Sequence, residues 1–314
     1  MTKLKQKSPW ARLFLAVAIG VVVTPLPPAR ADASPLPQKI EDNFNHTYLR
    51  PDTRAKWWII NWGEQNGQQV HVEDFCGPSS CYQLVSEHND SYANLVLQPG
   101  NTAGYFVNVD VAEEHTGYPA EIVNAWQPVP GKPVVLETTV RWSETYSIDA
   151  TGGALGSNGV WLWNSPYDNA SYEPLPPMNA IGFNYCQANT FGGFLDGLKF
   201  NVVYNTYPIT VVNAPPWLDM QQWNTFKFVW SVNPDGATES VDIYINGGYF
   251  ASMLIPFRLG KLSTEIWQDN EHFVLEEDGG AHIDYRALTQ QQRFMVSYFS
   301  LRHLDGSGGI ETIR

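Results

Sequence analysis

The feature that most constrains the fold is a series of short segments rich in Val, Ile, Tyr, Phe, Trp and Thr, each bounded by Gly, Pro, Asn or Asp. Such segments are typical of β-strands and their turns. The clearest example is residues 241–245, followed by Asn246-Gly247 and a second apolar run, because an Asn-Gly pair accepts the positive φ angles of a tight hairpin turn. Helical periodicity is nearly absent, and we expect one short helix, over residues 287–292.

Ten segments fit the strand pattern, and they are spread over the length of the chain. They are residues 92–98, 105–111, 134–142, 159–163, 179–185, 198–204, 225–232, 240–245, 249–253 and 294–302. Ten strands around one hydrophobic core favour two packed antiparallel sheets. The predicted fold class is therefore all-β, a two-sheet antiparallel β-sandwich, and a sandwich of this kind can use over 200 residues as one domain.

The first 33 residues are predicted to be a secretory signal peptide. A basic stretch precedes an apolar run over residues 13–23, and cleavage positions follow at Ala31 and Ala33. Eleven apolar residues are too few to span a bilayer as a stable helix, and the alternative is a retained N-terminal anchor. We expect a secreted protein, extracellular or periplasmic, with no membrane span. Its expected parts are a leader at 34–39, the sandwich at 40–304 and a flexible tail at 305–314.

The charge balance restricts the partners. Residues 1–33 hold five of the 19 basic residues and one of the 32 acidic ones, which leaves a net charge of −17 on the rest of the chain. Such a surface repels phosphate backbones, so we expect no nucleic-acid partner. Anionic polysaccharides are disfavoured for the same reason unless a local basic patch attracts them, whereas neutral glycans carry no such penalty.

The three cysteines divide into a close pair and a single residue. Cys76 and Cys81 flank a Gly-Pro turn, and in an oxidising compartment we expect them to form a disulfide. Four intervening residues do not match the two of a thioredoxin-like redox site. Cys186 is expected in the core, because a single Cys commonly packs as a small hydrophobe, and the alternative is a nucleophile. No zinc-ligand pattern is present.

Four segments follow one another in a familiar order. They are residues 41–45 with Trp57 and Trp58 soon after, residues 222–230, residues 241–247 and residues 294–302. The middle two resemble the paired strands of family-16 glycoside hydrolases, which read roughly W-H-x-Y-x-x-x-W and I-x-F-Y-V-D-G. The whole of 40–304 resembles the concanavalin A-like lectin/glucanase superfamily. The resemblance implies a β-jelly roll that binds or cleaves a polysaccharide or oligosaccharide.

The catalytic motif of family 16 is missing. That motif is Glu-x-Asp-x-Glu on one strand, where alternation places the three carboxylates on one face as nucleophile and acid/base. The corresponding segment here, residues 178–185, carries Asn179 and Asn184 and no acid. A neutral amide acts neither as nucleophile nor as proton donor in that scheme. We therefore expect a secreted carbohydrate-binding protein for neutral extracellular glycans, and whether it is also an enzyme stays open.

An acidic and aromatic segment is the first candidate site. In an extended chain Glu265, Trp267, Asp269 and Glu271 share one face. The ring can stack on a pyranose while the carboxylates accept hydrogen bonds from its hydroxyls. Asp269 and Glu271 are the candidate catalytic carboxylates, with Glu173 a weaker candidate. The alternative is a solvated loop with the tryptophan in the core.

The second candidate site contains Trp161 and Trp163, which share one strand face, followed by Asn164. The pair forms a stacking platform if that face is the concave one, and core if it faces the opposite sheet. Asn184 belongs to the same predicted ligand-binding set, with Glu265 and Trp267. We expect no cofactor, and the alternative is calcium at the acidic turn 276–280.

Three functions therefore compete. The first is carbohydrate binding without hydrolysis, the second a glycoside hydrolase or polysaccharide lyase with displaced carboxylates, and the third a structural or adhesive extracellular module. Two carboxyl groups about 5–10 Å apart in an aromatic groove favour an enzyme. A groove lined by Trp and Asn without such a pair favours binding, and a flat surface favours the third function.

Overall fold

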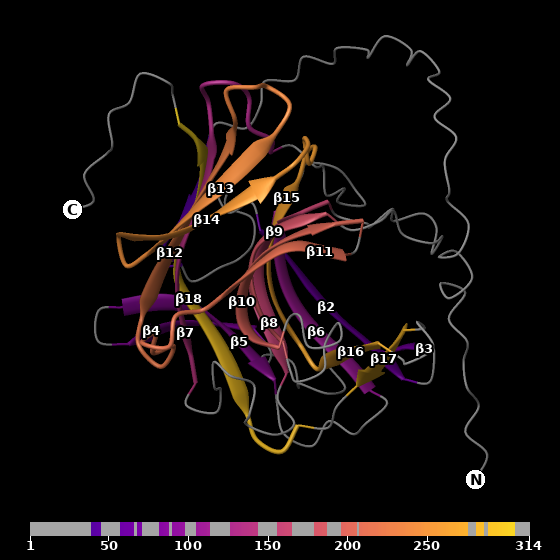
Figure 1. Cartoon of the computed structure of the whole chain (residues 1–314). Coiled ribbons are helices and arrows are strands. Elements are labelled where there is room, and N and C mark those ends of the chain that lie inside the picture. Colours follow the sequence, from indigo (N-terminus) through magenta and orange to yellow (C-terminus); the bar gives the residue numbers. More distant parts are fainter. Residues whose placement is uncertain are drawn as a thin grey trace.

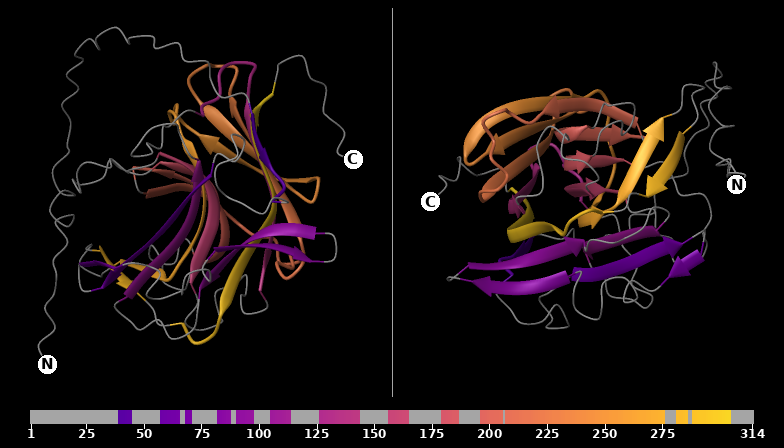
Figure 2. Two further views of the ribbon diagram at one scale, coloured as in Figure 1. Left: turned by 180° about the vertical axis from the view of Figure 1, so that it is seen from behind. Right: turned by 90° about the horizontal axis from the view of Figure 1, so that it is seen from below.

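The protein is a sandwich of two antiparallel β-sheets. A computed structural model describes residues 39–44, 57–65, 68–70, 82–87, 90–97, 105–113, 126–143, 156–164, 179–186, 196–205, 207–275, 281–285 and 288–304. Within these ranges every regular element is a strand, and the two large sheets lie face to face as separate layers (Figure 1). The same two layers are seen from behind in Figure 2. The structure thus confirms the predicted all-β two-sheet sandwich.

The first sheet, sheet A, has the order β14-β13-β12-β7-β18-β5-β4, with β1 also paired to β18. Its strands are β1 (Lys39–Asp42), β4 (Tyr82–Glu87), β5 (Asp90–Leu97), β7 (Val134–Trp142), β12 (Asn224–Val232), β13 (Glu239–Ile245), β14 (Gly248–Ile255) and β18 (Gln292–His303). Because strands from both ends of the chain alternate in this order, the sheet closes only when most of the chain is in place.

The second sheet, sheet B, has the order β11-β10-β9-β8-β15-β6-β2-β3. Its strands are β2 (Trp57–Gln65), β3 (Gln68–Val70), β6 (Tyr105–Glu113), β8 (Ser157–Trp163), β9 (Ala180–Cys186), β10 (Gly197–Tyr204), β11 (Tyr207–Asn213) and β15 (Ser263–Asp269). A separate hairpin, β16 (Glu271–Leu275) with β17 (Ala281–Tyr285), follows β15 directly. The described ranges contain no helix that is long and apolar enough to cross a membrane.

All ten strands predicted from the sequence are present, within a few residues at each end. The short helix predicted over 287–292 is wrong where the structure describes that stretch, because residues 288–291 are non-helical and β18 begins at Gln292. Two contacts explain the extended path. Leu288 is buried in the core, and the Gln292 side chain accepts a 2.6 Å hydrogen bond from the Gly156 amide.

The Asn-Gly hairpin forms as predicted between β13 and β14. Asn246 and Gly247 have φ angles of 49° and 81°, the positive pair that a two-residue hairpin turn requires. Asn246 also accepts a 2.8 Å hydrogen bond from the Thr225 amide of β12. The turn therefore fixes the register of β12, β13 and β14 together.

The core between the sheets is rich in aromatic rings. Phe183 of β9 has its ring centroid 4.8 Å from that of Phe226 and 6.4 Å from that of Phe228, both on β12 of sheet A. It also contacts Phe200 of β10 and Phe294 of β18. Full burial of a Phe side chain stabilises the folded state by roughly 1.5–3 kcal/mol, so this group is a major contact between the two layers.

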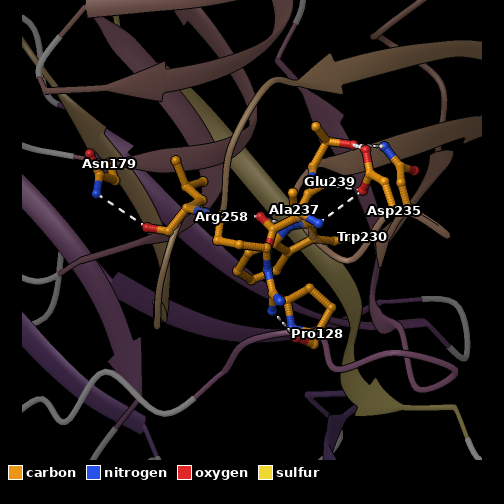
Figure 3. Close-up of polar contacts among 10 residues, drawn as sticks. Pro128, Asn179, Trp230, Asp235, Ala237, Glu239 and Arg258 are labelled. Atoms are coloured by element: carbon orange, nitrogen blue, oxygen red, sulfur yellow. Dashed lines mark hydrogen bonds and ion pairs between the residues drawn. The ribbon is translucent and has the colours of Figure 1, made fainter.

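A buried carboxylate ties the end of sheet A to the segment that leads into β15 (Figure 3). Glu239 of β13 accepts hydrogen bonds from Trp230 Nε1 at 2.9 Å, Arg258 Nε at 2.5 Å and the Leu259 amide at 3.0 Å. Arg258 also donates to the Pro128 carbonyl at 2.8 Å. The Glu239 side chain is 1 % exposed, so its charge depends on these partners.

We expect Glu239→Leu to lower the free energy of unfolding by about 3–5 kcal/mol, because it leaves the partners of a buried ion pair without their acceptor. Glu137→Leu is the matched control, since Glu137 forms a longer, more exposed pair with Arg302 at 3.4 Å and such pairs contribute about 0–1 kcal/mol. Urea titration of both variants measures the difference. Equal losses would contradict the role assigned to Glu239.

Candidate carbohydrate site

Sheet B has one face in the core and one face turned away from sheet A. Val160 of β8 and Ile181, Phe183 and Tyr185 of β9 belong to the core cluster, so the residues that alternate with them lie on the opposite face. We call this opposite face the outer face. On its four central strands it carries Ser157, Gly159, Trp161 and Trp163 of β8, Ala180, Gly182, Asn184 and Cys186 of β9, Gly197, Lys199, Asn201 and Val203 of β10, and Ser263, Glu265, Trp267 and Asp269 of β15.

The strand register arranges the outer face in rows. From β15 to β10, one row reads Trp267, Gly159, Asn184 and Lys199, and the next reads Glu265, Trp161, Gly182 and Asn201. In each row a tryptophan is followed by a glycine on the next strand. Each tryptophan is thus the neighbour in the sheet of a glycine that lies far from it in the sequence.

The two glycines leave room for indole rings that lie across the neighbouring strand. A Cβ at Gly159 would lie 3.0 Å from Trp267 Nε1, and a Cβ at Gly182 would lie 2.9 Å from Trp161 Cδ1. Glycine weakens a strand interior and commonly marks such a close approach. The five-membered part of each ring therefore lies over the next strand.

The rings form one connected group on the outer face. Trp161 and Trp267 meet edge to face, with centroids 5.2 Å apart at 61°, an arrangement that aromatic pairs prefer. Trp161 also packs against a small apolar cluster of Trp163, Ala180 and Val203 that is separate from the main core. Trp161 and Trp163 are therefore not part of the core between the sheets, which was the alternative to a stacking platform.

A chain of polar side chains lies beside the rings. Asn201 Nδ2 donates to Asn184 Oδ1, and Asn184 Nδ2 donates to Cys186 Sγ at 2.8 Å. In the part of the chain that the structure describes, the indole nitrogens of Trp161 and Trp267 and Oδ1 of Asn201 are buried without a hydrogen-bond partner. An unpaired buried group costs about 1–3 kcal/mol, so two donors and one acceptor here are left unsatisfied by the described residues.

Cys186 is buried, at 6 % exposure, which agrees with the prediction of a buried thiol. Its position differs from the prediction, because Tyr185 occupies the core side of β9 and Cys186 the outer face. Cys76 and Cys81 lie outside the described residues, so their disulfide stays a prediction.

Two carboxylates flank Trp267 on β15. Glu265 and Asp269 are 5 % and 7 % exposed, and four residues of strand separate their Cα atoms by about 13 Å. Catalytic carboxyl pairs lie about 5–9.5 Å apart, so these two reach that spacing only where both side chains lean along the strand over Trp267. Glu271 belongs to β16 and pairs with Tyr285, so the continuous face predicted from the sequence ends at Asp269.

Other predicted site residues have different surroundings. Asn164 accepts a hydrogen bond from the Asn179 amide and donates its own amide to the Asn179 carbonyl at 3.0 Å, so it joins the end of β8 to the start of β9. Glu173, the side chain of Glu271 and the acidic turn 276–280 lie outside the described part, so these predictions, including calcium, remain untested. The residues that the structure does describe contain no group of three metal-ligating side chains.

Lys199 and Asn201 are site residues that the sequence analysis missed. Lys199 Nζ donates to Asn213 Oδ1 of β11 at 2.5 Å. Burial lowers the pKa of Lys199, and the nearby Asp196 carboxylate offsets only part of that change. The sequence does carry a pattern that indicates their position: Lys199 and Asn201 alternate with the apolar residues Leu198, Phe200 and Val202, so they share the face opposite the core.

Comparison with solved structures identifies the fold. No family model and no curated protein sequence matches the chain. An endo-1,3-beta-glucanase from Streptomyces sioyaensis superposes with a TM-score of 0.50 and 13% identity, over 90% of this chain and 100% of that one. The fold is the concanavalin A-like jelly roll. A Bacillus licheniformis beta-glucanase has a TM-score of 0.48 at 12% identity over 84% of this chain and 98% of its own, and the Emp47p carbohydrate recognition domain has 0.43 at 12% over 87% and 98%.

β9 is the strand that the sequence analysis compared with the catalytic strand of family 16, on which the Glu-x-Asp-x-Glu triplet lies. That strand presents Ala180, Gly182, Asn184 and Cys186 to the outer face and no carboxylate. Chemistry by that triplet is therefore not available on β9. On the four central strands of the outer face, the acids lie on β15 instead.

The close approach of ring and glycine makes a specific prediction about stability. We expect Gly182→Ala to destabilise the fold by about 1–3 kcal/mol through overpacking, because its Cβ would lie 2.1 Å from the Val160 carbonyl oxygen. Gly248→Ala is the matched control, since its Cβ would meet only the Ile245 carbonyl oxygen at 3.5 Å. Thermal unfolding checks both, and an unchanged Tm for Gly182→Ala would refute the close packing of β8 on β9.

Proposed function

We propose that this protein is exported and binds carbohydrate on the outer face of sheet B, with neutral extracellular glycans as its ligands. The observation that carries the proposal is the pair of buried indole nitrogens on Trp161 and Trp267, without partners in the described chain, beside the unpaired Oδ1 of Asn201. A sugar hydroxyl both donates and accepts hydrogen bonds, so the hydroxyls of one sugar can pair with the indole donors and with the amide acceptor.

The composition of the face fits this ligand class. Small-molecule sites are lined mainly by aromatic and apolar groups with a few placed polar groups, and here Trp161, Trp163 and Trp267 lie beside the amides of Asn184 and Asn201. The neighbours in fold are named as glucanases or as a carbohydrate recognition domain. A fold hosts many functions, so the proposal depends on the site and the neighbours only agree with it.

The indole donors can be tested without removing the rings. We expect Trp161→Phe and Trp267→Phe each to weaken glycan binding about 2- to 10-fold, because each removes one hydrogen bond worth about 0.5–1.5 kcal/mol and keeps most of the stacking area. Trp217→Phe is the control, since Trp217 is 63 % exposed and lies on the connection between β11 and β12. A glycan array followed by calorimetry on the best ligand provides the measurement. Unchanged affinity in both site variants would place the site elsewhere.

A glycoside hydrolase or lyase is the second candidate, because Glu265 and Asp269 share the outer face with Trp267 on one central strand. In this alternative Asp269 acts with Glu265, or with Glu271 as expected from the sequence. The adhesive-module hypothesis has no comparable set of residues to support it.

Release of reducing sugars from a polysaccharide panel separates binding from catalysis. The binding proposal expects no release by the wild-type protein, together with weaker binding in Glu265→Gln and Asp269→Asn, which lose hydroxyl acceptors of full charge. The enzyme alternative expects release that falls at least 100-fold in these variants, in line with the contribution of a general acid or base. Circular dichroism confirms that the variants are folded.

A further inference from the structure

On its four central strands, the outer face carries its charges at two separate places. Glu265 and Asp269 lie on β15, and Lys199 lies on β10, with β8 and β9 between. Three strand spacings of about 4.8 Å separate them by about 14 Å. Among the outer-face side chains that the structure describes on β8, β9, β10, β11 and β15, Lys199 is the single cation. A ligand that crosses the strands therefore meets acids at one end and an ammonium group at the other.

The residues paired with Lys199 on the two neighbouring strands are polar and uncharged. It is paired in register with Asn184 on one side and Asn213 on the other, and its Nζ donates to Asn213 Oδ1 at 2.5 Å. The ion pairs found in the described part of the chain are Arg258 with Glu239 and Arg302 with Glu137, so Lys199 has no carboxylate within ion-pair distance there. Its ammonium retains donors that Asn213 does not use, since an ammonium has three.

Lys199 is partly buried, and no carboxylate of the described residues lies within ion-pair distance of its ammonium. Removing a charge from water is unfavourable unless it is paired, and burial lowers the pKa of Lys199 with only partial compensation by Asp196. Nearby, Asn201 Oδ1 is fully buried and unpaired. A ligand bearing an anion next to a hydroxyl would satisfy the ammonium and the amide oxygen together.

We infer that the outer-face site takes an otherwise neutral glycan with one anionic substituent, a carboxylate or a sulfate, and that Lys199 binds that substituent. This inference rests on the proposed carbohydrate function and narrows its ligand class. A chain charged at every sugar is excluded, because Glu265 and Asp269 at the far side of the site would repel it, as would the net charge of −17 on the chain after residue 33. Lys199 is thus a specificity-determining residue.

The test compares matched ligands on one array: neutral oligosaccharides, the same chains with a single carboxylate, and the same chains with a single sulfate. We expect the wild-type protein to bind one of the two substituted sets about tenfold more tightly than the neutral set at low salt, with the preference reduced at 0.5 M NaCl. The set that is preferred identifies the anion as carboxylate or sulfate.

Three variants complete the test. Lys199→Met should abolish the preference, and Lys199→Arg should keep the preference because it keeps the charge. Lys227→Met is the matched control, since Lys227 lies on sheet A with its ammonium 4.3 Å from the centroid of the Tyr244 ring.

The outcomes separate this inference from the proposed function. Equal binding of neutral and substituted chains by the wild-type protein, or a preference that survives Lys199→Met, overturns the role of Lys199 and leaves carbohydrate binding intact. Absence of binding to every glycan on the array overturns both. Loss of the preference in Lys227→Met as well would show a general charge effect and also overturn the assignment.

Discussion

The packing of Phe183 against Phe226 and Phe228 is the contact on which the rest of the arrangement depends. Once this ring is held between the sheets, alternation along β9 turns Gly182 and Asn184 to the outer face. The register with β8 and β10 then sets which residues adjoin them. A core contact thus positions a site to which it contributes no atom.

The outer face shows how a sheet can hold large rings close to its backbone. A tryptophan ring is held away from the sheet where the neighbouring strand carries side chains. Gly159 and Gly182 have no side chain, so the indoles of Trp267 and Trp161 lie across the neighbouring strands. The cost is weaker local strand preference at both glycines, which the well-packed core beneath offsets. The result is an aromatic surface beside two amides, all fixed by rigid strands rather than by loops.

The sequence predicts the strands well because their apolar residues alternate with a period of two, and the Asn246-Gly247 turn is specific. It also places Trp161 and Trp163 on one face, but alternation alone cannot say whether that face is turned towards the opposite sheet. The separation of Glu271 from Asp269 depends on a change of sheet after Asn270. Lys199 and Asn201 join the site only through the register of β9 and β10, which no local pattern encodes.

The same close approach restricts what this scaffold can become. Three carboxylates at alternate residues of β9 would require an acidic side chain at position 182. Any Cβ at that position meets the Val160 carbonyl oxygen and the Trp161 ring. A hydrolytic triplet on β9 and the indole of Trp161 therefore exclude each other. An evolutionary route from this protein to a family-16 type of active site would have to lose Trp161 and reshape β8 before any acid gained on β9 could function.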